Sequence, residues 1–410
     1  MNPLGVWMYG AKVGELSRHR SALTFTYTAA ALEEFGLGRP LLSVSMPTRP
    51  RPFRGAVPHA FFNGLLPEGE ARQMIAYDFG VEESDVLGLL GALGRDCAGA
   101  LVVIPGDEVP EVSATPEPIG EEDVSERLAR LGVHPLGVDG RVRASLAGMQ
   151  RKLLLSGREG GWGLPVGGAP STHILKPPHH DLRFPQMIAN EALCLRAAHH
   201  LGLPVAKVEV GSFAGTDVLV VERYDRTPRD DAGGVARIHQ EDFCQATAID
   251  GTRLRKYEEG GGPSLRMCAR TLTDWSRDPY QRELLLELIT FNVLVGNGDC
   301  HGKNLSLLHD QAGGVRLAPA YDIFSTIWYE AANTVPGMFV NDVRELSEIS
   351  KADLISEAVS WGLGTDVAAA RVERVLAAGE DALLRAAGEI ECPEELVQTL
   401  ISRSRALASA

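Results

Sequence analysis

Residues 279–296 contain the run LLLELITFNVLV, which constrains the fold more than any other part of the chain. Its apolar residues occupy nearly every face of the predicted helix, whereas a helix at a protein surface keeps one polar face toward water. We therefore expect this helix to lie inside a lobe of the protein, surrounded by other elements. A strongly polar loop, GNGDCHGKNLSLL over residues 296–308, follows it directly.

The first part of the chain is rich in strand patterns. Short β-type runs over residues 4–46 (GVWMYG, ALTFTYT and LLSVSMP) surround one helical run, AAALEEFG. Two helices follow at about 58–78 and 84–94, and then the strand GALVVIPG. Over residues 141–223 the β-type runs are RVRASLAG, RKLLLSG, THILKPP, AKVEVGS and DVLVVERY. A helix at about 185–202, bounded by Pro185 and Gly202, interrupts them.

Helical patterns dominate after about residue 235. We predict helices at 239–249, 264–276 and 279–296 and several from about 346 to 408, with one β-hairpin formed by NLSLLHD and GGVRLAP. The stretch PGDEVPEVSATPEPIGEEDV is rich in proline and acidic residues, which is typical of a linker. We therefore predict an α+β fold with an N-terminal α/β domain at 1–110, a linker at 111–125, a β-rich lobe at 126–225 and a helical lobe at 226–410.

Composition excludes some classes of function. No apolar run reaches the roughly 20 residues of a membrane span, and MNPLGVWMYG does not resemble a secretory signal. The six cysteines form no C-x-x-C motif, so we expect reduced thiols in the cytoplasm rather than a zinc site or disulfides. A net charge of −14 repels nucleic acid unless a local basic patch intervenes. The one dense basic run in the sequence, RPRPFRG at 49–55, is interpreted as a solvated loop, and a phosphate-binding patch is the alternative.

The polar loop places Asp299 and Asn304 at the spacing D-x-x-x-x-N, and Asp322 follows the next hairpin. In protein kinases an Asp at the first position accepts the proton of the attacking hydroxyl, while the Asn and the later Asp bind magnesium. Mg²⁺ prefers hard oxygen ligands, which an amide, a carboxylate and nucleotide phosphates provide. The spacing alone has little specificity, and a capped, solvated turn is the alternative. The core helix, hairpin and second Asp together favour a kinase site.

A kinase also needs a phosphate-covering loop and a lysine in its β-rich part. The segment SLAGMQRK at 145–152 holds Gly148 but does not match a known glycine-rich motif, and taken alone it is better interpreted as a hairpin turn. Lys176 ends a strand before two prolines, and Glu191 on the next helix is a candidate ion-pair partner for it. A solvated lysine and a surface carboxylate are the alternatives. The segment VVERYDR at 220–226 could present backbone groups to an adenine, or form a plain edge strand.

Taken together, these segments resemble the HipA family, whose members are serine/threonine kinases that act as toxins of type II toxin–antitoxin modules. The resemblance extends over nearly the whole chain. The matching segments, in order, are LPEGEAR, LGRDCAGAL, SLAGMQRKLLL, THILKPP, NEALCLRAA, VVERYDR, HQEDFCQA, NGDCHGKN and PAYDI. It implies a kinase-like core of two lobes, β-rich and helical, behind a small N-terminal α/β domain.

The resemblance also implies roles for single residues. Asp299 would be the catalytic base, with His301 and Lys303 beside it in the catalytic loop, and Asn304 and Asp322 would bind Mg²⁺. Ser145 would be an autophosphorylation site whose added charge expels the phosphate loop. The implied ATP contacts are Ala147, Gly148, Met149, Gln150, Arg151, Lys152, Lys176, Glu222, Arg223, Tyr224, His301, Asn304 and Tyr321.

Two positions depart from the family pattern. Arg151 stands where some members have an acidic residue, which could change how easily the loop is expelled. Cys300 lies beside the base where other members often have a small or neutral residue, and its thiol could be oxidised. Neither departure affects a proposed metal or base position.

The resemblance implies a small helix-turn-helix antitoxin as partner, with DNA contacted chiefly through it. The expected substrate is a translation factor, such as an aminoacyl-tRNA synthetase. A catalytically idle corepressor and a small-molecule kinase are the alternatives. The presence of Asp299, Asn304 and Asp322 argues against the idle corepressor, which needs none of them.

Overall fold

The structure is a computed structural model that describes residues 2–106, 108–111, 114–158, 160–228, 234–311, 313–331 and 334–409. The chain forms two compact units. Unit 1 comprises Met1–Pro177, Gly211–Thr252 and Leu308–Gly313, and unit 2 comprises Pro178–Val210, Arg253–Leu307 and Gly314–Ala410. The predicted domains group the chain in another way, and their boundaries stay predictions. The mixture of helices and sheets confirms the predicted α+β class.

The first part of unit 1 is an antiparallel five-stranded sheet with the order β4-β3-β2-β1-β5. Its strands are β1 (Leu4–Met8), β2 (Ala11–His19), β3 (Ala22–Tyr27), β4 (Phe53–Arg54) and β5 (Val102–Pro105). The accompanying helices are α1 (Ala29–Phe35), α2 (Ala56–Gly64), α3 (Gly69–Asp78) and α4 (Val86–Leu93). Leu16 lies opposite Phe25 in the sheet, and both side chains are fully buried, so this register sets the core.

A second sheet has the order β10-β11-β9-β7-β8-β6. Its strands are β6 (Glu117–Ile119), β7 (Leu153–Arg158), β8 (Gly161–Leu164), β9 (His173–Lys176), β10 (Val208–Phe213) and β11 (Thr216–Glu222). The other elements of this region are α5 (Glu121–Ala129), β12 (Arg226–Pro228), β13 (Val235–Arg237), β14 (His239–Asp242) and α7 (Phe243–Ala246). The predicted linker thus contains β6 and the start of α5, and its residues 112–113 lie outside the described residues.

Unit 2 is mainly helical. Its helices are α6 (Met187–His200), η1 (Arg253–Lys256), η2 (Glu258–Gly260), α8 (Leu265–Trp275), α9 (Tyr280–Val295), α10 (Lys351–Ser360), α11 (Thr365–Ala387) and α12 (Glu394–Ser409). Strand β16 (Val315–Leu317) also lies in unit 2, and strand β15 (Ser306–His309) begins there. Within the part of the chain that the structure describes, no helix has the length and apolar character needed to cross a bilayer.

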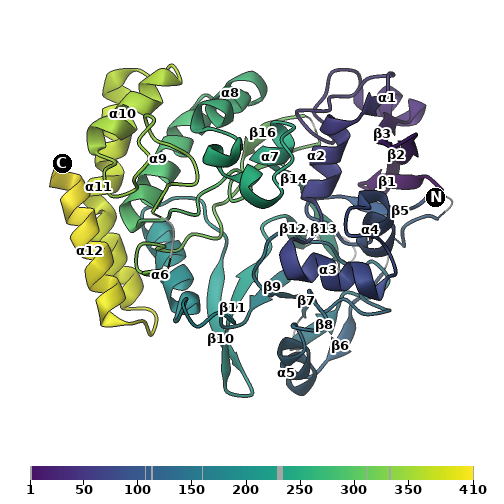
Figure 1. The fold of residues 1–410 in the computed structure, drawn as a ribbon, viewed down its shortest axis with the longest axis horizontal. Helices are drawn as coiled ribbons and strands as arrows, with labels where there is room; N and C mark the ends of the chain where they lie inside the picture. Colours follow the sequence, from purple (N-terminus) through teal and green to yellow (C-terminus); the bar gives the residue numbers. More distant parts are fainter. Residues whose placement is uncertain are drawn as a thin grey trace. The chain divides into compact units, whose positions relative to one another are not determined.

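Helix α9 lies at the centre of the helices of unit 2, as its sequence predicts. Helices α8, α10, α11 and α12 all contact it, and Figure 1 shows α11 and α12 running side by side. Its residues from Leu284 to Val295 are all buried. Gly379 of α11 allows a close approach, because a Cβ there would lie 2.5 Å from Leu294 Cδ1. Burial on all sides explains why this helix has no polar face.

Several predicted strands and helices are wrong. Residues 41–47, all of them described, form turns and bends, because the Ser43 hydroxyl and carbonyl accept hydrogen bonds from the nearby N–H groups of Ser45 and Met46. Residues 141–148 make only isolated bridges. The predicted helix at 58–78 is two helices, α2 and α3, separated around Pro67, which has no N–H to donate.

Two further differences come from weak local patterns. The predicted helix at 239–249 is strand β14 followed by the short helix α7. Strand β2 is missing from the prediction, because its sequence AKVGELSRH has a glycine and several charges. Gly14 in this strand is required by packing, since a Cβ there would lie 2.3 Å from the Phe25 ring. Tertiary contact therefore decides this strand more than its local sequence does.

Candidate functional site

The polar loop after α9 begins at a fixed point. Gly296 ends the helix with φ 69°, in the left-handed region that glycine adopts at low cost. The Thr326 hydroxyl donates to the Gly296 carbonyl (3.1 Å) and accepts the Gly298 N–H (2.8 Å). The Thr326 N–H also donates to the Gly296 carbonyl at 3.0 Å. These contacts fix the direction in which the chain leaves the core helix.

Two hydrogen bonds with asparagine side chains hold the backbone of Asp299, one on each side of its Cα. Its N–H donates to Asn297 Oδ1 at 3.0 Å, and its carbonyl accepts from Asn304 Nδ2 at 2.9 Å. The D-x-x-x-x-N spacing therefore closes a loop in which Asn304 grips the backbone of Asp299. Asn304 is buried, whereas the side chain of Asp299 is 30% exposed. The predicted base is the accessible member of the loop.

His301 and Lys303 lie in the same loop. His301 Nε2 lies 3.8 Å from Asp299 Oδ1, and His301 Nδ1 accepts the Lys303 N–H at 3.3 Å. The N–H of Gly302 donates to the Lys256 carbonyl at 3.1 Å, which ties the loop to the segment before η2. The side chains of His301 and Lys303 are both buried, so neither is a solvated surface group.

The residues after the hairpin return to this loop. The Tyr321 hydroxyl donates to the Lys303 carbonyl at 2.8 Å and lies 2.6 Å from Ser306 Oγ. Asp322, the next residue, has φ 56°, a left-handed conformation that is uncommon for a residue with a side chain. The predicted second metal ligand is therefore a backbone outlier, attached to the catalytic loop through Tyr321.

Sequence reasoning missed Tyr257. Its hydroxyl donates to Asp299 Oδ1 at 2.6 Å, across 42 residues of sequence. The motif around it, RLRKYEEGGG, has no periodic pattern that predicts contact with the loop. Only its position in unit 2, between η1 and η2, brings it to the proposed base.

The Cys300 thiol is not poised for oxidation. Burial, and then the neighbouring Asp299 carboxylate, raise the pKa of Cys300 to about 12. The thiol is therefore protonated at neutral pH, and the thiolate is the form that reacts. Cys300 is better described as a small apolar residue beside the base.

The predicted phosphate loop lies in unit 1. Lys152 Nζ donates to the Ala147 carbonyl at 2.9 Å, which folds the loop back on itself. Gly148 has φ 113°, and a Cβ there would lie 2.3 Å from Lys152 Nζ. The positive φ therefore disfavours a residue with a side chain at position 148, and the Lys152 ammonium would have to move to make room for one. Met149 is 65% exposed, and the Arg151 guanidinium packs beside Gly132.

Ser145, at the start of this loop, is fully buried. Its hydroxyl donates to the Leu65 carbonyl at 2.7 Å, and its N–H donates to the Asp96 carbonyl at 2.9 Å. The hydroxyl is therefore shielded in this conformation. Any kinase that modifies Ser145 requires the loop to move first.

The remaining predicted contacts are described unit by unit. Lys176 ends β9 and is buried, which excludes the alternative of a solvated lysine. Glu191, on α6 in unit 2, is buried as well, so it is not a surface carboxylate. The two residues belong to different units, and their ion pair stays a prediction. In unit 1 the Tyr224 hydroxyl donates to Gln240 Oε1, and Glu222 is exposed at the end of β11.

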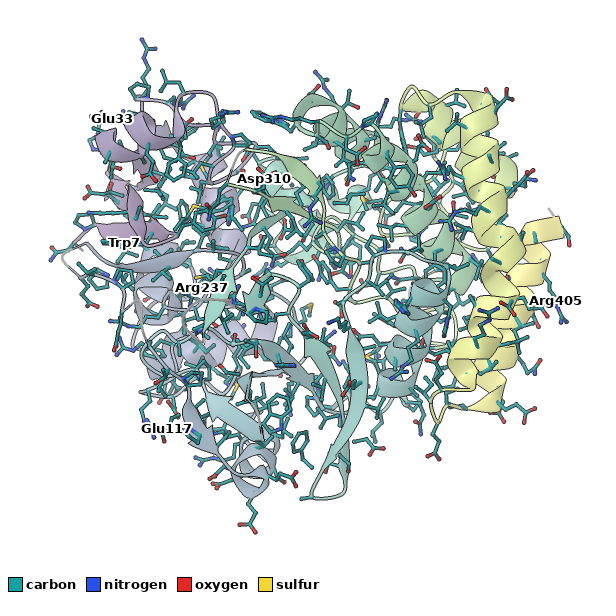
Figure 2. The ribbon with its side chains drawn as sticks, turned by 180° about the vertical axis from the view of Figure 1, so that it is seen from behind. Trp7, Glu33, Glu117, Arg237, Asp310 and Arg405 are labelled. Carbon is teal, nitrogen blue, oxygen red and sulfur yellow. The ribbon has the colours of Figure 1, made fainter. Side chains whose placement is uncertain are left out.

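The guanidinium of Arg223 has a structural partner. It donates to both carboxylate oxygens of Asp225, at 2.9 and 2.8 Å, within a buried charge cluster. The cluster consists of Asp96, Arg223, Asp225, Arg226 and Arg237, the last of which Figure 2 labels. If Arg223 contacts the adenine, it therefore does so through atoms outside the guanidinium. This contact stays a prediction.

The two predicted metal ligands carry side-chain oxygen atoms, the ligand type that a magnesium ion binds. Within the described ranges, no three His, Cys, Asp or Glu side chains are grouped to hold a metal. The predicted ligands Asn304 and Asp322 offer hard oxygens only. Because Asn304 Nδ2 is used on the Asp299 carbonyl, its Oδ1 is the atom left for a cation. Mg²⁺ binds through one or two such groups together with phosphates and water.

Two family models match the chain. The model described as HipA N-terminal domain matches residues 4–104, and the model described as HipA-like C-terminal domain matches residues 144–383. These ranges include the loop at 145–152, the catalytic loop and Asp322.

Individual relatives match over similar lengths. A protein from Sinorhizobium fredii named "Putative kinase Y4mE" is 39% identical over 391 residues, which cover 93% of this chain and 91% of the relative. The "Serine/threonine-protein kinase toxin HipA" of Shewanella oneidensis is 29% identical over 328 residues, covering 77% and 74%. A solved complex of Shewanella oneidensis HipA, HipB and operator DNA contains a chain with a TM-score of 0.84 and 26% identity, covering 99% of this chain and 96% of that one.

Proposed function

Because the chain belongs to the HipA family of kinases, we propose that it is an ATP- and magnesium-dependent serine/threonine protein kinase and the toxin of a type II toxin–antitoxin module. The match to the Shewanella structure over nearly the whole chain confirms the predicted HipA-like fold. The observation that carries the proposed chemistry is the closed catalytic loop, in which Asn304 Nδ2 holds the Asp299 carbonyl at 2.9 Å.

In this proposal Asp299 is the general base. The serine or threonine oxygen attacks the γ-phosphorus of ATP, the bond from that phosphorus to the β–γ bridging oxygen breaks, and ADP leaves. The hydroxyl proton passes to the Asp299 carboxylate, which is partly exposed and held by its backbone. His301 and Lys303 would bring positive or hydrogen-bonding groups to the phosphates.

Asn304 and Asp322 would hold the cation through their side-chain oxygens. When bound, Mg²⁺ neutralises phosphate charge as it develops in phosphoryl transfer. The loop at 147–152, with its glycine at 148, would cover the phosphates, and Lys176 would reach them. Residues 222–224 would border the adenine.

The proposed partner is a small helix-turn-helix antitoxin, through which the kinase would reach DNA. The Shewanella relative was solved with HipB and operator DNA, which supports this choice. The net charge of −14 suits a basic protein partner better than direct contact with DNA. The proposed substrate is a translation factor, such as an aminoacyl-tRNA synthetase.

The proposal is tested by transfer of label from γ-labelled ATP to dephosphorylated casein and to the chain itself. We expect label with Mg²⁺ and none with excess EDTA, and a loss of at least about 100-fold in Asp322→Ala, because the cation then lacks its carboxylate. Asp381→Ala, which removes an exposed carboxylate on the surface of α11 in unit 2, is the control and should keep its activity. Equal label in wild type and Asp322→Ala would contradict the kinase. A chain that binds its antitoxin without any transfer would support the idle corepressor.

Ser145 is expected to receive one phosphate from the chain's own activity. The site is fully buried, so a group with a charge near −2 cannot fit there and the loop must leave its place. Mass spectrometry of the protein after incubation with Mg-ATP should locate the phosphate on Ser145.

The control is Ser156→Ala. Ser156 is also buried in unit 1, and its hydroxyl also donates to a backbone carbonyl, that of Pro170, at 2.7 Å. Ser156→Ala should still be labelled, and Ser145→Ala should not. Label that persists at full level in Ser145→Ala would show that another residue is the site.

A further inference from the structure

Tyr257 makes the most direct side-chain contact with the proposed base. Its hydroxyl lies 2.6 Å from Asp299 Oδ1, a length typical of a hydrogen bond to a charged carboxylate. Among the described residues, His301 Nε2 also lies near this oxygen, but at 3.8 Å it is beyond hydrogen-bond range. Tyr257 is therefore the group that can fix the rotation of the carboxylate.

The rest of Asp299 does not fix that rotation. The contacts with Asn297 and Asn304 act on its backbone N–H and carbonyl. Among the described residues, Asp299 Oδ2 accepts no hydrogen bond within the chain. One carboxylate oxygen is thus occupied by Tyr257, and the other is left for a hydroxyl that arrives from outside.

Tyr257 is itself held on the side of the catalytic loop. Its ring meets the His301 ring edge to face, with centroids 4.9 Å apart and an interplanar angle of 86°. The neighbouring Lys256 carbonyl accepts the Gly302 N–H at 3.1 Å, and the Tyr257 carbonyl accepts the Gly262 N–H at 2.8 Å. The Tyr257 ring and the backbone beside it are therefore both attached to the catalytic loop.

A second set of contacts supports the same segment from another direction. The Glu258 N–H donates to the Gly337 carbonyl at 2.9 Å, and Glu258 Oε2 accepts the Phe339 N–H at 2.7 Å. Gly337 packs closely on the catalytic loop, since a Cβ there would lie 2.6 Å from the Cys300 carbonyl carbon. Residues 256–258 are thus tied to the loop directly and through residues 337–339.

We propose that Tyr257 is a positioning residue that turns Asp299 so that Oδ2 faces the serine or threonine hydroxyl. This inference rests on the proposed function, because it assumes that Asp299 is the base. The partial exposure of the Asp299 side chain leaves room for the substrate while Tyr257 stays in place. A base that can rotate freely spends less time in reacting geometry, which lowers the rate without weakening ATP binding.

Tyr257→Phe removes the hydroxyl and keeps the ring on His301. With γ-labelled ATP and dephosphorylated casein, we expect kcat to fall about 10- to 100-fold with the KM for ATP unchanged. Tyr280→Phe is the matched control, because that hydroxyl also donates to a carboxylate in unit 2, Glu287, at 3.3 Å. It should leave kcat unchanged. An increase in kcat in Tyr257→Phe would show instead that the hydroxyl blocks the place of the substrate, and wild-type kcat would also overturn the proposal.

A double-mutant cycle separates positioning from a general structural effect. If Tyr257 acts through Asp299, Tyr257→Phe should have no further effect on the residual single-turnover rate of Asp299→Asn. A full additional loss in that background would mean that Tyr257 supports the fold rather than the base.

A final measurement does not depend on kinase activity. Crystal structures of the full chain should show one orientation of the Asp299 carboxylate in the wild type and a rotated or divided one in Tyr257→Phe. An unchanged carboxylate in the variant would overturn the proposal whatever the kinase assays show. A changed carboxylate in a protein that transfers no phosphate would uphold the positioning and reject the proposed function.

Discussion

Replacing Asp299 with asparagine is expected to lower phosphoryl transfer by about 100- to 10,000-fold while the protein stays folded. General bases contribute factors of this size, equivalent to about 3 to 5 kcal/mol of activation free energy. Asparagine keeps the shape of the side chain and an oxygen that can accept the Tyr257 hydroxyl. The surrounding contacts act on the backbone, so they survive the change. The loss should therefore appear in kcat and not in stability.

The matched control is Asp274→Asn on α8. Asp274 is an exposed carboxylate in unit 2, and it forms an ion pair with Arg270 at 3.6 Å on the helix surface. It should keep wild-type kcat and wild-type thermal unfolding. The measurement is the initial rate of label transfer at saturating Mg-ATP, beside thermal unfolding of each protein. Should Asp299→Asn keep more than about a tenth of the wild-type rate, Asp299 is not the base.

The parts of the site that the sequence predicts are those encoded locally. Asp299 and Asn304 lie five positions apart, and the contact between Asn304 Nδ2 and the Asp299 carbonyl uses that spacing directly. The interior helix α9 was predictable for the same reason, because a run of apolar residues without a polar face leaves few other places for it. Gly148 indicates a tight loop in the sequence, and its positive φ explains why this position is a glycine.

The parts that the sequence does not predict depend on contacts between distant segments. Tyr257 reaches Asp299 across 42 residues, and Ser145 is buried through Leu65 across 80. The sequence around Tyr257 and around Ser145 has no pattern that predicts these contacts. The strand predicted at 141–148 is wrong for the same reason. Its residues form isolated bridges with positions 96 and 166 and do not join a sheet.

The sequence also does not predict the charge cluster around Asp96. It predicts only that the segment VVERYDR could lie beside the adenine of ATP. In the structure, two charged residues of this segment, Arg223 and Arg226, form buried ion pairs with Asp225 and Asp96. Asp96 is fully buried and accepts from Arg226 (3.0 Å) and from the Ser171 N–H (2.9 Å) and hydroxyl (2.6 Å). Its backbone carbonyl also accepts the Ser145 N–H, which joins the cluster to the phosphate loop.

Asp96→Asn is expected to destabilise unit 1 by about 3 to 5 kcal/mol at pH 7. Removing one partner of a buried ion pair leaves the other charge uncompensated. Here Arg223 and Arg226 would share Asp225, while Arg237 would lose the Asp96 carboxylate. Glu15→Gln is the control, because it breaks an exposed ion pair with Lys12 in the same unit and should cost less than about 1 kcal/mol. Urea unfolding followed by circular dichroism measures both values.

The pH dependence of this difference gives a second, independent readout. Burial raises the pKa of Asp96, but Arg226, Arg223 and Arg237 outweigh it and hold the pKa well below its ordinary value. A carboxyl group whose pKa is lower in the folded than in the unfolded state stabilises the fold fully above its unfolded value of about 4, and this contribution is lost as the pH falls toward the folded pKa. The gap in unfolding free energy between wild type and Asp96→Asn should therefore be constant from about pH 5 to 7 and narrow below about pH 4. A gap that is equally large at pH 3, or absent at pH 7, would show that the Asp96 charge does not hold the cluster together.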